Sequence, residues 1–235
     1  MRVRTPRTYS LGPWTFDLRP WTSDLRPWTS DLGPAVNMLP CENVTAFVLG
    51  TGPDLPADRL GRLEGYFTLG VNGLWRHGCT PTVSLWIDGG VYRQCPSHFD
   101  RTLCVCDRSV RTRPEQIGLE MKAGPLPRHL NPNRLYHLPN TGVVAALWAV
   151  SLGCCPVVLL GMGCLNDGRA PAQLGAMRAA LDAAVAMDYR PRGACWPALW
   201  PWSGDPKEFD DNLRNYHVRP ADTPALLQDL REFFA

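Results

Sequence analysis

The feature that most constrains this fold is a set of short, apolar, β-prone runs in which polar and apolar residues do not alternate. Val44–Leu49 and Pro156–Leu160 are the clearest, and Tyr66–Val71, Thr82–Ile87 and a run near Thr102–Cys106 lie between them. A strand with one solvated face alternates polar and apolar residues, whereas a strand that is apolar throughout is buried on both faces. These runs therefore predict a parallel sheet that is covered by helices on both sides.

Helical patterns separate or follow the strand-like runs. The clearest begins at Asn140-Thr141-Gly142 and ends at Gly153, where a left-handed cap is expected. The last covers 223–235 and is predicted to be capped by Thr223, and two others are predicted after Gly52 and over Pro171–Met187. Strands and helices in this order predict the α/β class, as a single Rossmann-like domain with a mostly parallel sheet and helices on both faces.

The first part of the chain has a different pattern. Residues 13–34 repeat a seven-residue unit that begins with Pro-Trp-Thr, and a proline in every unit forbids a continuous helix. Two interpretations stay open: a translated DNA repeat upstream of a natural start at Met38, which makes 1–37 a mistranslated extension, or a Pro/Trp-rich docking tail. Both predict that 1–37 is a disordered tail. The folded domain is then 38–235, with a Trp/Pro-rich flap at 189–206.

The composition excludes several classes of partner. The chain has 24 basic and 22 acidic side chains, so its charge gives no case for a nucleic acid or a membrane surface. It contains no apolar run of about 18 residues, so no membrane span is expected. Nine cysteines occur without any Cys-x-x-Cys spacing and without a secretory signal, which fits reduced thiols in a cytoplasmic protein and predicts no metal centre. The sequence leaves the oligomeric state unknown.

Small or polar residues follow each strand that can be placed. In a parallel sheet the carboxyl ends of the strands share one edge, and ligands bind there. Glycines after the first strand would let the backbone approach a phosphate closely, and the N-terminus of a following helix favours an anion. The residues predicted to bind a nucleotide are Gly50, Thr51, Gly52, Pro53, Asn72, Asn140, Thr141, Gly142 and Gly161.

Each of these assignments has a structural alternative. The segment from Gly50 to Gly52 could be a tight connection that binds nothing, and Asn140 could cap its helix with the same N–H groups that an anion would use. Asn72 could be a left-handed turn residue, and Asp88 could be a solvated turn residue. Asp88 is also the residue through which Mg²⁺ could act, provided that phosphates supply the other ligands.

The candidates for catalysis are His137, His217 and Asp88. His137 lies three residues before Asn140, and His217 follows the Trp-rich segment. Histidine is the commonest general acid or base in enzymes, but a lone histidine is more often incidental. The tryptophans of the flap could stack on a base or sugar, or they could close the core.

Three motifs resemble a known family. Phe47-Val48-Leu49-Gly50-Thr51-Gly52-Pro53-Asp54-Leu55 resembles the G-N-G-P-S-L opening of bacterial sialyltransferases and of the archaeal-type 6-hydroxymethylpterin diphosphokinase-like proteins. Leu69-Gly70-Val71-Asn72 is similar to their second-strand motif, which ends in Asn. The segment from Asn140 to Leu147, continued by Leu152-Gly153 and Val158–Met162, is similar to their S-G-x-x-A-x-x-x-A-x-x-L-G…I-Y-L-x-G-x-D segment.

The resemblance implies a nucleotide site at the carboxyl edge of the sheet. It implies that Gly50, Thr51 and Gly52 contact the nucleotide and phosphate, that Asn72 contacts phosphate or sugar, and that Asn140, Thr141 and Gly142 contact the nucleotide. The expected function is a nucleotide-dependent transferase, with glycosyl transfer from a nucleotide-sugar donor as the first choice. The alternatives are diphosphate transfer from ATP to a small heterocycle, which needs Mg²⁺, and nucleotide binding without turnover. Gly163 in place of the family's acidic residue favours the last of these.

Overall fold

The computed structural model describes residues 39–42, 44–52, 55–124, 130–137, 140–154, 157–162, 197–199 and 221–235. The chain divides into two units, Met1–Asn37 and Met38–Ala235, and the described residues belong to the second. Several predictions lie outside the described residues: the disordered tail 1–37, Pro53, the helix at 171–187, the flap at 189–206 apart from the backbone of 197–199, and His217.

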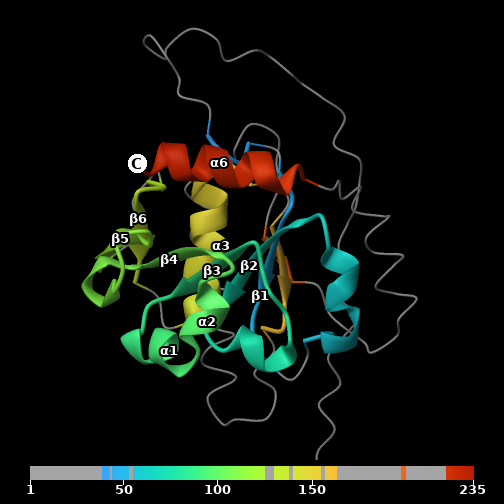
Figure 1. Ribbon diagram of the computed structural model, residues 1–235. Coiled ribbons are helices and arrows are strands. Elements are labelled where there is room, and N and C mark those ends of the chain that lie inside the picture. The colour runs from blue at the N-terminus through green and yellow to red at the C-terminus, as the bar shows by residue number, and fades with distance from the viewer. Residues whose placement is uncertain are drawn as a thin grey trace, which may run out of the picture. The chain divides into compact units, whose positions relative to one another are not determined.

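A parallel sheet forms the centre of the described domain. Its eight strands have the order β6-β5-β4-β3-β2-β1-β7-β8, and every neighbouring pair is parallel (Figure 1). The runs predicted as strands are β1, β2, β3, β4 and β7, so the predicted α/β, Rossmann-like class is confirmed. The strands are β1 (Ala46–Leu49), β2 (Phe67–Val71), β3 (Val83–Trp86), β4 (Leu103–Asp107), β5 (Ile117–Lys122), β6 (Arg134–Tyr136), β7 (Val157–Leu160) and β8 (Pro197–Leu199).

Both faces of the sheet are buried, which explains why the strands do not alternate. Successive side chains of a strand point to opposite faces. Ala46 and Val48 of β1 pack in a cluster with the helices of one face, whereas Phe47 and Leu49 pack with Leu60 on the other face. All four β1 side chains are fully buried. Burial of an aliphatic or aromatic side chain of this size contributes about 1.5–3 kcal/mol, so neither face tolerates a polar residue cheaply.

Helical segments cover the two faces. On one face lie α3 (Thr141–Ser151) and the C-terminal α6 (Thr223–Phe233), and α3 is buried along its whole length. On the other face lie η1 (Ala57–Leu63), η2 (Leu74–His77), α1 (Gly89–Gln94) and α2 (Pro96–Phe99). A short η3 (Arg108–Val110) joins β4 to β5. Figure 1 shows α6 near one end of the sheet and α1 and α2 near the other.

The order of the strands creates a switch point. From β1 to β6 the chain adds strands in one direction, and α3 then leads it back to β7 on the opposite side of β1. In open α/β sheets, ligands bind outside the carboxyl ends of the strands at such a reversal. The first residue of α3 and the segments after β1, β2 and β3 all lie at this end.

Local differences from the prediction have physical causes. The helix expected after Gly52 is a seven-residue 3₁₀ helix that starts at Ala57, so it offers a weaker dipole than an α-helix would. The cap of α6 is Asp222, whose carboxylate accepts from the Ala225 N–H at 3.2 Å, and Thr223 is already inside the helix. Strands β5 and β6 were not predicted, because β5 is partly exposed and contains two charged residues, and the edge strand β6 has three residues only.

The described ranges were searched for membrane-spanning helices and for disulfides. None of their helices combines the length and the apolar composition that a bilayer crossing requires. Their six cysteines, Cys41, Cys79, Cys95, Cys104, Cys106 and Cys154, are free thiols.

Candidate functional site

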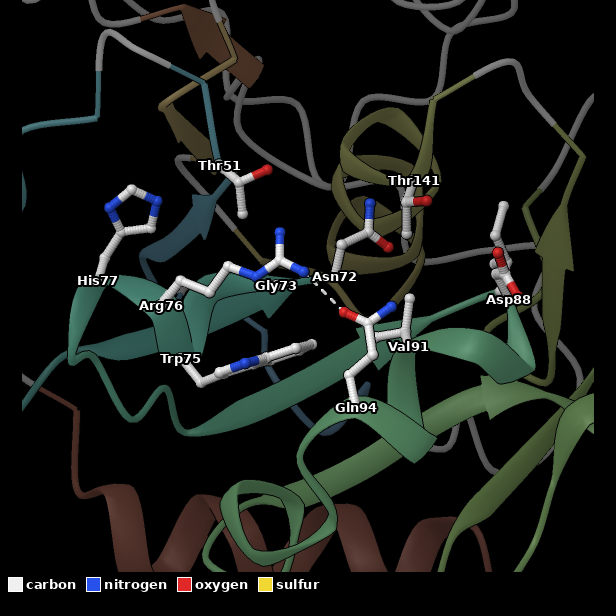
Figure 2. A pocket seen from close by; sticks show the side chains of 11 residues that line it. Thr51, Asn72, Gly73, Trp75, Arg76, His77, Asp88, Val91, Gln94 and Thr141 are labelled. Atoms are coloured by element: carbon white, nitrogen blue, oxygen red, sulfur yellow. Dashed lines mark hydrogen bonds between the residues drawn. The ribbon is translucent and has the colours of Figure 1, made fainter.

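A cavity of about 490 Å³ lies at the carboxyl edge of the sheet. Its walls come from segments that are far apart in the sequence: the ends of β1, β2 and β3, the 3₁₀ helix η2, the helix α1 and the start of α3 (Figure 2). The lining residues are Thr51, Asn72, Gly73, Trp75, Arg76, His77, Ile87, Asp88, Val91, Gln94 and Thr141.

Four residues singled out from the sequence meet in this cavity. Thr51 follows β1, Asn72 follows β2, Asp88 follows β3, and Thr141 is the first residue of α3. They converge because all the strands are parallel and end at the same edge. Their hydroxyl, amide and carboxylate groups give the cavity hydrogen-bonding capacity on several sides.

Asn72 combines a structural role with its place in the cavity. Its φ is 51°, so it has the left-handed backbone conformation of a turn residue, which was the structural alternative for Asn72. Its N–H donates to the Leu85 carbonyl at 3.4 Å, which links the end of β2 to β3. The turn directs the Asn72 side chain toward the cavity, so the turn and a ligand contact do not exclude each other (Figure 2).

Asp88 is the carboxylate of the cavity lining, and it also caps α1. Its Oδ1 accepts from the Gly90 N–H at 2.7 Å. A capping carboxylate uses part of its acceptor capacity and keeps the rest, since two oxygens offer about four lone-pair sites. Asp88 can therefore cap the helix and still accept a proton or a hydrogen bond from a ligand.

The residues that sequence reasoning missed come mainly from η2 and α1. Arg76 donates from Nη2 to Gln94 Oε1 at 2.7 Å, and its guanidinium carbon lies 5.7 Å from the centre of the Trp75 ring. The only signal in the sequence was the position of Trp75-Arg76-His77 directly after the Asn72-Gly73 turn. Nothing in that segment indicated that its side chains face the ligand edge, because a short 3₁₀ helix has too few residues for a periodic pattern.

Trp75 is supported from behind by an aromatic cluster. Its ring lies 5.5 Å from Phe99, edge to face, and 5.8 Å from His98. His98 is buried, and burial, with a smaller contribution from Arg101, lowers its pKa below the usual 6.5. The ring is therefore neutral at pH 7 and adds no charge beneath the cavity.

The glycines after β1 have a packing role. Gly50 donates its N–H to the Leu160 carbonyl at 2.8 Å, and Gly52 donates to the Gly161 carbonyl at 2.8 Å. A Cβ on Gly50 would lie 2.2 Å from the Gly161 oxygen, and Gly161 itself has a φ of +66°. The N–H groups of Gly50 and Gly52 are thus bonded to the end of β7 and to the residue after it, so their predicted phosphate contacts gain no support from this geometry. None of Gly50, Gly52 and Gly161 lines the cavity.

Asn140 caps the start of α3, as its structural alternative predicted. Asn140 Oδ1 accepts from the Gly142 N–H at 2.7 Å. A Cβ on Gly142 would lie 2.4 Å from Met162 Sδ, so this glycine allows α3 to pack against the end of β7. Asn140 and Gly142 flank the cavity through Thr141, but they do not line it.

Of the catalytic candidates, Asp88 lines the cavity. His137 is exposed at the end of β6, where its backbone N–H donates to the Lys122 carbonyl at 2.8 Å. Its side chain does not line the cavity. In the part of the chain that the structure describes, no group of three or more His, Cys, Asp or Glu could hold a metal ion.

Comparison with known proteins adds no relative from which a role could be transferred. No family model matches the chain, and no curated protein matches it.

Proposed function

We propose that this protein is a nucleotide-dependent transferase that binds its donor in the carboxyl-edge cavity and transfers a glycosyl group from it. The observation that carries the proposal is the convergence of Thr51, Asn72, Asp88 and Thr141 on one cavity. These residues were chosen from the sequence because each follows a strand or begins a helix, and a ligand site at this edge requires that they meet.

The chemistry of the cavity suits a nucleotide. Its volume, about 490 Å³, falls in the range typical of small-molecule sites. Arg76 supplies a cation for phosphate, and the Asn72 amide and the Thr51 and Thr141 hydroxyls supply directional hydrogen bonds for phosphate or sugar. Ile87 and Val91 add apolar surface for the less polar part of the ligand.

Catalysis would depend on positioning the donor and stabilising the leaving phosphate. Arg76 would offset the negative charge that develops on the phosphate as the glycosidic bond breaks. Asp88 would accept the proton of the acceptor hydroxyl, since it is the carboxylate of the lining.

Glycosyl transfer is preferred over the other nucleotide chemistries because of the motif resemblance to the sialyltransferases. Diphosphate transfer from ATP needs Mg²⁺, and among the described residues that line the cavity there is one carboxylate, Asp88, which also caps α1. A single carboxylate holds Mg²⁺ only together with the phosphates of the ligand. Free thiols suit the cytoplasm, where we place the protein.

A thermal-shift screen of the full chain tests the proposal. The ligands are CMP, UDP, ATP and their sugar conjugates, each with and without Mg²⁺. We expect the largest stabilisation from a nucleotide sugar or its nucleotide without metal, since a bound ligand raises the unfolding temperature by mass action. Stabilisation only by ATP with Mg²⁺ would select the diphosphokinase alternative, and no stabilisation by any nucleotide would refute the proposal.

Turnover separates a transferase from a binding protein. The stabilising nucleotide sugar is incubated with the protein, and released nucleotide is measured by chromatography with water and simple sugars as acceptors. Asn72→Gly is the matched variant, because glycine keeps the left-handed backbone and removes only the amide. We expect nucleotide affinity to fall about 2- to 10-fold, the effect of one neutral hydrogen bond.

A further inference from the structure

Arg76 is restrained from three sides inside the cavity. Its side chain folds back over Gly73, where an added Cβ would lie 3.5 Å from Arg76 Nε. The guanidinium lies over the Trp75 ring, with 5.7 Å between its carbon and the ring centre, and it donates to Gln94 at 2.7 Å. Figure 2 shows the guanidinium directed into the cavity and the bond to Gln94.

The groups that hold Arg76 are neutral, in contrast to the carboxylate partners of Arg113 and Arg134. Arg113 lies beside the carboxylates of Asp100 and Glu115, and Arg134 pairs with Glu120 at 3.3 Å. An amide oxygen and an indole ring fix the geometry of Arg76 without neutralising its charge. The guanidinium has five N–H donors, so the bond to Gln94 leaves donors for a ligand.

The opposite charge lies at the other end of the cavity. Figure 2 shows Arg76 and His77 toward one side and Asp88 toward the other, with Asn72 and Thr141 between them. Helix α1 separates Asp88 at its cap from Gln94 at its last residue, and its six residues span about 9 Å. A ligand that fills the cavity therefore meets a cation at one end and a carboxylate at the other.

We propose that Arg76 forms a phosphate subsite, with Gln94 and Trp75 as positioning residues, and that the ligand extends from it with its hydroxyl-bearing part toward Asp88. A planar guanidinium matches the oxygens of a phosphate with two parallel hydrogen bonds. A carboxylate accepts hydrogen bonds from sugar or acceptor hydroxyls and repels a phosphate placed at its end. The inference rests on the proposed function only in that a nucleotide supplies the phosphate.

Calorimetric titration of the full chain tests the subsite with probes that do or do not carry a phosphate. The probes are inorganic pyrophosphate and two nucleotides, CMP and AMP, each compared with its own nucleoside, cytidine or adenosine. In the unaltered protein, the nucleotide should bind more tightly than its nucleoside. Arg76→Gln should weaken pyrophosphate and nucleotide about 10- to 150-fold, the effect of a charge-assisted hydrogen bond, and leave the nucleoside unchanged. Arg231→Gln removes the same charge from the exposed part of α6 and should change none of these affinities.

A second variant guards against misfolding and tests the geometry. Arg76→Lys keeps the charge and loses the planar fork, so it should give an intermediate loss of pyrophosphate affinity. Gln94→Leu should weaken pyrophosphate by a smaller factor, and it should have no further effect when combined with Arg76→Gln. A Gln94 that served only the stability of α1 would give the same loss in both backgrounds, which would overturn its positioning role.

The outcomes separate this inference from the proposed function. If pyrophosphate binds through Arg76 and no nucleotide binds, the subsite stands and the transferase proposal fails. If a nucleotide binds, and the Arg76→Gln variant still binds the nucleotide more tightly than the nucleoside by the same factor, the transferase proposal stands and the subsite is wrong. If none of the probes binds, both are wrong.

Discussion

The end of β1 and the end of β2 carry similar sequence signals but form different structures. After β1, Gly50 bonds to the last residue of β7 and Gly52 bonds to Gly161, which in turn lies close to Gly50 and Leu55. After β2, the Asn72-Gly73 turn opens into the cavity, with Arg76 folded over it. Both segments follow a buried strand at the same edge, yet the first contributes Thr51 to the cavity lining, whereas the second contributes the turn and most of η2.

The difference teaches what a glycine at a strand end can mean. A glycine allows close approach, but the approaching group can be a ligand or the protein's own backbone. At Gly50 it is the Gly161 carbonyl, because β1 lies between β2 and β7 and has a neighbour on each side.

Gly50→Ala, in the packed segment after β1, should have the largest effect on stability. The added Cβ would lie 2.2 Å from a backbone oxygen that cannot rotate away, so we expect a loss of about 3 kcal/mol or more in the free energy of unfolding. Urea denaturation followed by circular dichroism measures it. The control is Gly61→Ala, where nothing lies within 4 Å and no loss is expected. A fully stable Gly50→Ala protein would mean that the two strands can separate at this point.

Asp88→Asn should lower the transfer rate at the cavity without unfolding the protein. Asparagine caps helices as well as aspartate does, so stability should change by less than about 0.5 kcal/mol. The transfer rate should fall about 100-fold or more if Asp88 accepts the acceptor proton. Asp107→Asn is the control, because Asp107 caps η3 in the same way, accepting from the Ser109 N–H at 2.9 Å. An unchanged rate for Asp88→Asn would reduce Asp88 to a cap.

Gly142→Ala should cost less than Gly50→Ala, although its Cβ would also be too close to a neighbour. That neighbour is the flexible end of Met162, at 2.4 Å from the added carbon, and it can move aside. We expect a loss of about 1–2 kcal/mol in the free energy of unfolding. Met162→Ala should cost about 1 kcal/mol less in the Gly142→Ala background than alone, as a double-mutant cycle would show. Additive losses would contradict this contact.

The pH dependence through His98 should give the smallest effect. Burial lowers its folded pKa below 6.5, so the unfolded chain binds a proton that the folded chain rejects. The stability present above about pH 6.5 is therefore lost as the pH falls toward the lowered pKa. Denaturation at pH 7 and pH 5 should show a smaller pH-dependent loss for His98→Phe than for the unaltered protein.

The fold was largely predictable because burial on both faces leaves a signal in each strand separately. The runs at β1 and β7 are apolar throughout, and those at β2, β3 and β4 each contain one polar side chain, Thr68, Ser84 and Asp107. Helix α3 is capped by Asn140 and is followed by Gly153 with a φ of +88°. Strand β5 was missed because its partly exposed residues include Glu120 and Lys122, which interrupt the apolar run, and the edge strand β6 was missed because three residues are too few for a pattern. The Asp222 cap was missed because Asp and Thr are both good caps and stand side by side.

Four of the eleven residues that line the cavity could be predicted. Thr51, Asn72, Asp88 and Thr141 follow from the rule that parallel strands end at one edge. Trp75, Arg76 and Gln94 could not be found in this way, because they lie on a 3₁₀ helix and a six-residue helix whose facing depends on how they pack against the sheet.

The sequence alone determined that the chain forms a parallel sheet covered on both faces and that polar residues gather at its carboxyl edge. These properties depend on local chemistry, namely on which residues can be buried and which can end a strand. The tertiary structure decided which part of that edge is closed and which is open. That choice depends on the strand order 2-1-7, which places the backbone after β7 against Gly50 and leaves the ends of β2 and β3 facing Arg76, and no single segment contains this information.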